Sequence, residues 1–230
     1  MIQEALAREV LAHAVATGGD FAEIFLEDRV DHRLQMRSSK IDAVSTGRLH
    51  GAGVRVFDGT RAIYVHTNDT SREGLLKCAD TAAAAIHAAN APAVIPALGL
   101  RSAARPETIR LWPGDVKAAL KAEKLRAADA AARSISPEIA QVMAYFTDSV
   151  QNVWIFNTEG VAVADTRVYT RLGVQAIASN GTENQTGFDG PGASMGFELF
   201  DQRVDPEKTG RTAAETARTM LHAPACPAGY

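Results

Sequence analysis

The stretch LHGAGVRVFDGTRAIYVH at residues 49–66 decides the fold. Ala52, Val54 and Val56 recur at every second position, which is the period of a half-buried strand. Asp58-Gly59 follows as a two-residue hairpin signal, because both residues tolerate a positive φ. Residues 60–66 then return as the partner strand. This stretch therefore predicts an antiparallel hairpin.

The residues before this hairpin predict a helix and further strands. Apolar residues recur every four positions across residues 2–17, which predicts a helix with one buried face. Gly18-Gly19 ends it, since glycine readily takes the left-handed conformation. Residues 22–36 alternate with period two, so they form one long strand or two strands joined by a bulge near Asp28. A shorter strand is expected at residues 40–45.

A helix follows the hairpin and closes the first unit. Thr70-Ser71-Arg72-Glu73 has the pattern of a capping box, and the helix that it opens is expected to end near Asn90. We therefore expect a first α+β unit at residues 1–90. Four of the nine prolines fall between residues 90 and 114, so residues 91–114 are predicted to be a linker over the surface.

The second predicted unit, residues 115–224, repeats this order. A helix is expected at residues 115–133, and turns are expected at Glu159-Gly160 and Asn180-Gly181. Strands are expected at residues 139–146, 150–156, 161–164, 167–178 and 197–200. Asp205-Pro206 is a strong helix start, and that helix should run to about Leu221. The fold class is therefore α+β, with two helix–antiparallel-sheet–helix units. A duplication is a hypothesis only, because the repetition is of pattern and not of residues.

Composition argues against several classes of function. The net charge is −3, and no basic cluster resembles a phosphate-binding face, so we expect no direct nucleic-acid binding. No stretch of 18 apolar residues predicts a membrane span, and the first residues lack the apolar core of a signal peptide. Two cysteines, Cys78 and Cys226, fit a reducing compartment. We expect a cytoplasmic protein.

The motif Gly192-Ala193-Ser194-Met195-Gly196 matches the G-x-S-x-G pattern of serine hydrolases. That chemistry needs the serine on a sharp strand-to-helix turn, with a histidine as base. No helix is expected to begin at Ser194, and the downstream His222 lies at a helix end. We therefore interpret the motif as a glycine-rich hairpin.

The histidines and acidic residues suggest no complete site. Glu9 with His13, and His222 with Cys226, are the pairs with helical spacing, but two residues do not make a metal site. The acidic residues of the first long strand are interpreted as a solvated face; they are Glu23, Glu27, Asp28 and Asp31. We therefore assign no catalytic, cofactor-binding or metal-binding residue in this chain.

Several short stretches, taken in order, resemble the N-terminal part of the TldD/PmbA family of zinc metallopeptidases, which is also named for modulation of DNA gyrase. The matching stretches are residues 20–28, 51–56, 63–69, 157–160, 165–167, 192–198 and 225–229. Arg167 and the glycine-rich stretch are closer to the TldD branch than to the PmbA branch.

The resemblance implies a zinc-dependent peptidase that acts on extended peptides and pairs with a related subunit. The family's H-E-x-x-x-H motif is expected just beyond Tyr230, so residues 225–230 would begin a metal-binding domain, and Cys226 does not match the family's ligand cysteine. This chain alone is expected to be inactive, with no zinc of its own. Residues 21–36 or 167–178 are the strands expected to pair with a peptide. The alternative is a non-catalytic partner subunit of such a complex.

Overall fold

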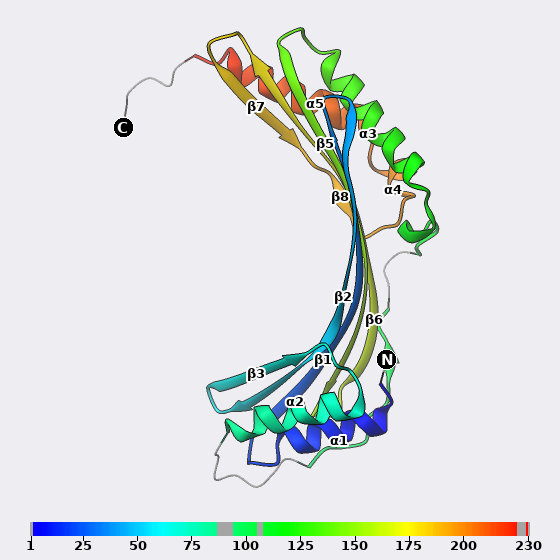
Figure 1. The fold of residues 1–230 in the computed structure, drawn as a ribbon, viewed down its shortest axis with the longest axis vertical. Coiled ribbons are helices and arrows are strands. Elements are labelled where there is room, and N and C mark those ends of the chain that lie inside the picture. The colour runs from blue at the N-terminus through cyan, green and yellow to red at the C-terminus, as the bar shows by residue number, and fades with distance from the viewer. Residues whose placement is uncertain (1, 87–93, 105–107, 225–228, 230) are drawn as a thin grey trace. The chain divides into compact units, whose positions relative to one another are not determined.

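The computed structural model describes residues 2–86, 94–104, 108–224 and 229 (Figure 1). Their strands form one sheet in the order β3-β2-β1-β5-β6-β4, and β7 and β8 also pair with β6. Pairing is antiparallel for β3, β7 and β8, whereas β4 runs parallel to β6. The bounds are β1 Phe21–Arg37, β2 Lys40–Asp58, β3 Arg61–Thr67, β4 Arg101–Ser102, β5 Ile139–Asn157, β6 Ala162–Ser179, β7 Asn184–Asp189 and β8 Gly192–Ala193. The predicted α+β class is confirmed.

Four strands are longer than the sequence predicts. β1, β2, β5 and β6 have 17, 19, 19 and 18 residues. The predicted breaks within β2, β5 and β6 are therefore wrong, and β1 is a single strand. No proline interrupts these stretches, so the backbone can stay extended through the polar residues that suggested loops. The turn between β1 and β2 uses Ser38 and Ser39, both with positive φ.

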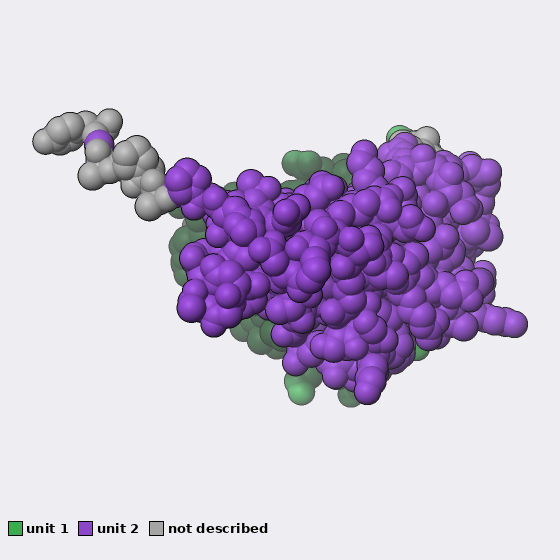
Figure 2. Space-filling view, turned by 90° about the horizontal axis from the view of Figure 1, so that it is seen from above, with its two compact units in different colours: residues 1–30, 48–106, 151–167 green, residues 31–47, 107–150, 168–230 purple. Residues whose placement is uncertain are grey.

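The described residues group into two compact units (Figure 2). Unit 1 contains Met1–Val30, Arg48–Pro106 and Gln151–Arg167, and unit 2 contains Asp31–Gly47, Glu107–Val150 and Val168–Tyr230. This grouping differs from the division at 1–90, 91–114 and 115–224 that the sequence suggests. The two divisions differ because β1, β2, β5 and β6 each have one end in unit 1 and the other end in unit 2.

In unit 1, two helices cover one face of the sheet. They are α1, Glu4–Ala14, and α2, Arg72–Ala84. Their core includes Leu11, Ile24, Val54 and Leu75, which are fully buried. The helix cap of α2 differs from the predicted capping box: Ser71, and not Thr70, accepts the hydrogen bond, from the N–H of Gly74. Other predicted turns are confirmed, since Gly18, Gly59 and Gly160 have positive φ.

In unit 2, α3, Ala118–Arg133, and α5, Pro206–Leu221, cover one face of the sheet. Asp205 caps α5 as predicted, and its side chain accepts a hydrogen bond from the N–H of Glu207. The strand predicted at residues 197–200 is wrong: α4, Leu199–Gln202, begins there after a turn. Leu199 and Phe200 are both buried, and two adjacent side chains cannot both face the core from a regular strand.

Parts of the proline-rich stretch contact the fold, although most of its described residues are exposed. Arg101 and Ser102 form β4 and pair with Val163 and Ala164 of β6. Leu98 is 8% exposed and belongs to the core of unit 1. A short 3₁₀ helix, η1, at Pro113–Asp115 leads toward α3. The predicted linker therefore contacts the sheet and the core at a few points, and residues 91–93 and 105–107 lie outside the described residues.

Candidate functional site

The sheet of unit 1 has one face without helices, which we call the open face of unit 1 (Figure 1). Tyr64 of β3 lies on it, because its neighbours Ile63 and Val65 pack against the core below α2. The Tyr64 ring covers Gly53 of β2, where any side chain would collide with it. The guanidinium of Arg55 lies 5.3 Å from the centre of the Tyr64 ring, and the His66 ring stacks at 6.1 Å.

Unit 2 has an equivalent open face. The Tyr145 ring covers Gly173, where a side chain would collide with it. The Arg33 guanidinium lies 5.7 Å from the centre of that ring, and the Phe188 ring stacks on it at 6.4 Å. Gly187 packs on the backbone of α5, so Phe188, the next residue of β7, points to the opposite face. Both units therefore carry a tyrosine over a glycine, with an arginine and a second ring. This recurrence favours duplication, which stays a hypothesis.

Two cavities lie on the open face of unit 1, each of about 290 Å³. They share Phe25, Gly53 and Tyr64 in their linings. Glu23 lines one and Glu27 lines the other, so part of the acidic strand face is not merely solvated. A third cavity in unit 1, of about 490 Å³, lies between the β4 region and the Glu159-Gly160 turn.

The acidic residues of β1 have different partners. Glu23 forms an ion pair of 2.8 Å with Arg55. Asp28 accepts two hydrogen bonds from Arg48, at 2.8 and 2.9 Å. These bonds lower the pKa of Asp28 more than its partial burial raises it. Glu27 instead accepts a hydrogen bond of 2.7 Å from the Gln151 amide, which carries no charge.

The two strands that were expected to pair with a peptide are not available for strand addition. β1 lies between β2 and β5. β7 and β8 occupy the edge of β6 between Thr170 and Ser179. Because the backbone groups of both strands already bond to neighbours, the expectation is wrong for these two strands. Contact with a peptide would have to use their side chains.

The G-x-S-x-G motif has a structural role in unit 2. Gly192 and Ala193 pair with β6, a turn follows, and Ser194 is exposed. The carboxylate of Glu198 accepts hydrogen bonds from the N–H groups of Arg110 and Leu111, at 3.1 and 2.8 Å. Gly196 leaves room for the carbonyl of Leu111, because any side chain there would collide with it. Gly196 and Glu198 therefore hold residues 110–111 in place within unit 2.

Replacing Glu198 with alanine should lower the free energy of unfolding by about 2–4 kcal/mol, since three backbone donors lose their acceptor. Burial alone would raise the pKa of Glu198, but the backbone donors of Leu111, Arg110 and Gly196 outweigh it and hold the pKa below the usual value. The stabilisation is therefore present above the ordinary glutamate pKa and is lost as the pH falls through the folded-state pKa. Urea unfolding at pH 7 and pH 3 should show a smaller effect at pH 3. Glu215→Ala, at an exposed position of α5, is the control and should change little.

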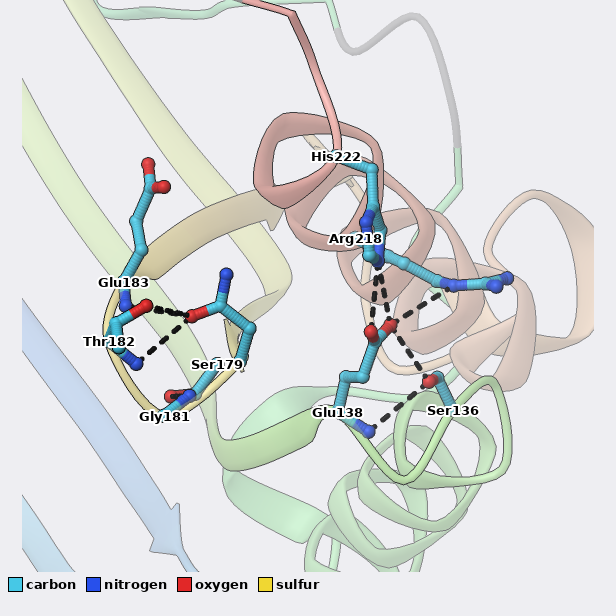
Figure 3. Close-up of polar contacts among 9 residues, drawn as sticks. Ser136, Glu138, Ser179, Gly181, Thr182, Glu183, Arg218 and His222 are labelled. Carbon is cyan, nitrogen blue, oxygen red and sulfur yellow. Dashed lines mark hydrogen bonds and ion pairs between the residues drawn. The ribbon is translucent and has the colours of Figure 1, made fainter.

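His222, the candidate base for Ser194, bonds to Glu138 instead. Its Nε2 lies 2.9 and 3.1 Å from the two carboxylate oxygens of Glu138, and Arg218 also donates to Glu138 (Figure 3). The His222 hydrogen bond is the largest of the effects that lower the pKa of Glu138. Cys226, the other half of that predicted pair, lies outside the described residues.

Glu9 and His13, the other pair with helical spacing, each bond to a different partner. His13 bonds to Asp80 at 2.7 Å, whereas Glu9 forms an ion pair with Arg72. In the part of the chain that the structure describes, no three His, Cys, Asp or Glu side chains group as metal ligands. The donor set that a zinc ion requires is thus not found among these residues.

A buried polar group in unit 2 was missed by sequence reasoning. Asp148 of β5 is fully buried, and its two oxygens bond to Lys121 Nζ at 2.5 Å and to His32 Nδ1 at 2.7 Å. Lys121 is itself 4% exposed in its side chain. The three residues come from β1, α3 and β5, so no local motif could indicate them. The one signal was that Asp148 is the single charged residue of β5.

Comparison with known proteins identifies the chain's relatives. Residues 22–86 match the model of PmbA/TldA metallopeptidase domain 1, and residues 112–221 match that of the PmbA/TldA metallopeptidase central domain. The chain belongs to the TldD/PmbA family. A metalloprotease of Methanothermobacter thermautotrophicus is 28% identical over 222 residues, and the match covers 89% of this chain and 46% of that protein. A metalloprotease TldD homolog of Haemophilus influenzae is 23% identical over 216 residues, covering 91% and 45%.

Solved structures of TldD/PmbA-like proteins share the fold. A protein described as a modulator of a DNA gyrase, from Thermotoga maritima, superposes with a TM-score of 0.72 at 18% identity, covering 98% of this chain and 50% of that one. TldE from Thermococcus kodakarensis gives a TM-score of 0.61 at 17% identity, covering 92% and 47%. The chain thus spans about half the length of the relatives that it matches. Among the described residues, no helix is both long and apolar enough to cross a membrane.

Proposed function

We propose that this chain is the N-terminal part of a TldD-type zinc-dependent peptidase, in which it shapes the substrate chamber and the subunit interface. One observation carries the proposal. The chain belongs to a metallopeptidase family, and each of its units has an open sheet face. On each face a tyrosine ring covers a glycine, and an aromatic ring is exposed to solvent. The zinc site and its chemistry belong to residues outside those described here. The substrate would be an extended peptide, and the partner a related subunit.

The chemistry of the open faces suits a peptide chain. Flat rings over a glycine give broad contact at little cost in side-chain entropy, and they accept many kinds of side chain. Tyr64 is 53% exposed and Phe188 is 50% exposed, so both offer apolar area to a ligand. Arg33 and Arg55 are close to these rings and can donate to peptide carbonyls.

Photo-cross-linking tests whether a peptide lies on these faces. We would place p-benzoylphenylalanine at Phe188 or Tyr64 and irradiate the chain with a labelled unfolded peptide. Met220 on α5 is the control, because it is 49% exposed and lies on a helix. Strong labelling from the two open-face positions and weak labelling from the control is expected. Equal labelling from all three positions would contradict the proposal.

The second candidate function is a non-catalytic partner subunit, which the similarity to TldE keeps open. In that case the complete protein would form a stable complex with a paralogue and hold no zinc. Zinc analysis of the complete protein, alone and in that complex, distinguishes the two candidates. Zinc bound by the complete protein alone excludes the partner role.

The cellular setting is part of the proposal. The net charge of −3 gives no basic face for DNA, so we propose that any effect on gyrase is indirect. We propose a cytoplasmic location because two cysteines in 230 residues are typical of a reducing compartment. A gel shift with duplex DNA at physiological salt should show no complex.

A further inference from the structure

One cavity on the open face of unit 1 combines apolar walls with a carboxylate. It has a volume of about 290 Å³. Its walls include Phe25, Leu49 and Tyr64, and Gly51 and Gly53 contribute no side chain to fill it. Leu49 is 56% exposed and Tyr64 is 53% exposed, so the cavity opens to solvent along an apolar rim.

The carboxylate is Glu27, and the partner described for it is a neutral amide. Glu23 and Asp28, on the same strand, each pair with an arginine. The hydrogen bond described for Glu27 comes instead from the neutral amide of Gln151, at 2.7 Å. A carboxylate whose described partner is a neutral donor can form an ion pair with an added cation.

We infer that this cavity binds a basic side chain, lysine or arginine, of an extended peptide. The inference deepens the proposed function and rests on it. The methylene stem of such a side chain would pack on Leu49 and Phe25, and its charged end would reach Glu27. The exposed face of Tyr64 adds a cation–π contact. A neutral side chain can pack on the same walls, but it lacks the ionic attraction to Glu27.

The test compares two labelled ten-residue peptides that are otherwise uncharged. One has a central arginine, and the other has citrulline, its neutral isostere. Fluorescence anisotropy with the 230-residue chain, at pH 8 and low salt, should show the arginine peptide binding about tenfold more tightly. His50 and His66 also line this cavity, so both peptides are compared at the same pH.

Two variants locate the preference. Glu27→Gln keeps an acceptor for Gln151 but removes the charge, so the two peptides should bind equally. Glu23→Gln is the matched control, because that carboxylate already pairs with Arg55, and the preference should persist. Leu49→Ser, at an exposed position, should weaken both peptides alike.

The outcomes separate this inference from the proposed function. Peptides that bind without an arginine preference, or a preference that survives Glu27→Gln, would overturn the inference alone. Absence of binding by either peptide would overturn the proposed presentation of peptides and the inference with it. Thermal melting of each variant, expected within a few degrees of the wild type, confirms that the comparison is made on folded protein.

Discussion

Replacing Asp148 with asparagine is expected to lower the free energy of unfolding by about 3–5 kcal/mol, because it leaves a buried lysine without its counter-charge. Lys121 Nζ lies 2.5 Å from one Asp148 oxygen, and His32 Nδ1 lies 2.7 Å from the other. Asparagine has nearly the same shape as aspartate, so the loss of stability is caused by the missing charge and not by a change in side-chain volume. Urea unfolding of the 230-residue chain at pH 7 measures it.

The matched control is another histidine–aspartate contact. Asp80 bonds to His13 at 2.7 Å, but its side chain is 61% exposed, so Asp80→Asn should cost less than about 1 kcal/mol. Adding Lys121→Met to Asp148→Asn should recover most of the loss, because it removes the uncompensated charge. An Asp148→Asn effect no larger than that of Asp80→Asn would contradict this description of unit 2.

The second large effect is expected at Gly210, where α5 crosses α3. A methyl group at Gly210 would collide with the backbone carbonyl of Ala128. At an exposed helical position, glycine to alanine is stabilising by up to about 1 kcal/mol. Here the backbone of α3 would have to move, so we expect Gly210→Ala to destabilise unit 2 by about 2–3 kcal/mol. Thermal unfolding shows directly whether Gly210→Ala raises or lowers the stability of the protein.

Gly114→Ala provides the comparison for this change. A methyl group at Gly114 meets no atom within 4 Å, so this substitution should be nearly neutral. If Gly210→Ala were as stable as the wild type, the result would contradict the close approach of α5 to α3 at this position. Both substitutions add one methyl group to a glycine in unit 2, so the difference between them isolates the contact.

Local signals predicted much of the fold. Asp58-Gly59 made the β2–β3 hairpin predictable, and Asp205-Pro206 gave the start of α5, because caps and tight turns depend on a few adjacent residues. The Ser38–Ser39 turn was missed because serine rarely takes a positive φ, so no local rule indicates it. The continuity of the long strands was missed because it depends on pairing with neighbouring strands.

The open faces and the buried group could not be predicted in the same way. Tyr64 and Gly53 meet through the register of β2 and β3, and Tyr145 meets Gly173 through neighbouring strands. Lys121, Asp148 and His32 come together only when α3 packs on the sheet. The sequence led to no catalytic assignment, and family resemblance supplied the class of chemistry. The Ser194 motif was interpreted as a glycine-rich hairpin, and the contacts of Gly196 and Glu198 with residues 110–111 were not foreseen.

Zinc content and peptide hydrolysis, measured together, test the central claim most directly. The 230-residue chain and the complete gene product would be purified in parallel, and zinc per mole would be compared with the cleavage of an unfolded peptide. We predict that the complete product holds zinc and cleaves the peptide, and that a chelator abolishes the cleavage. We predict that the 230-residue chain does neither. Stoichiometric zinc and chelator-sensitive cleavage by the 230-residue chain alone would contradict the account.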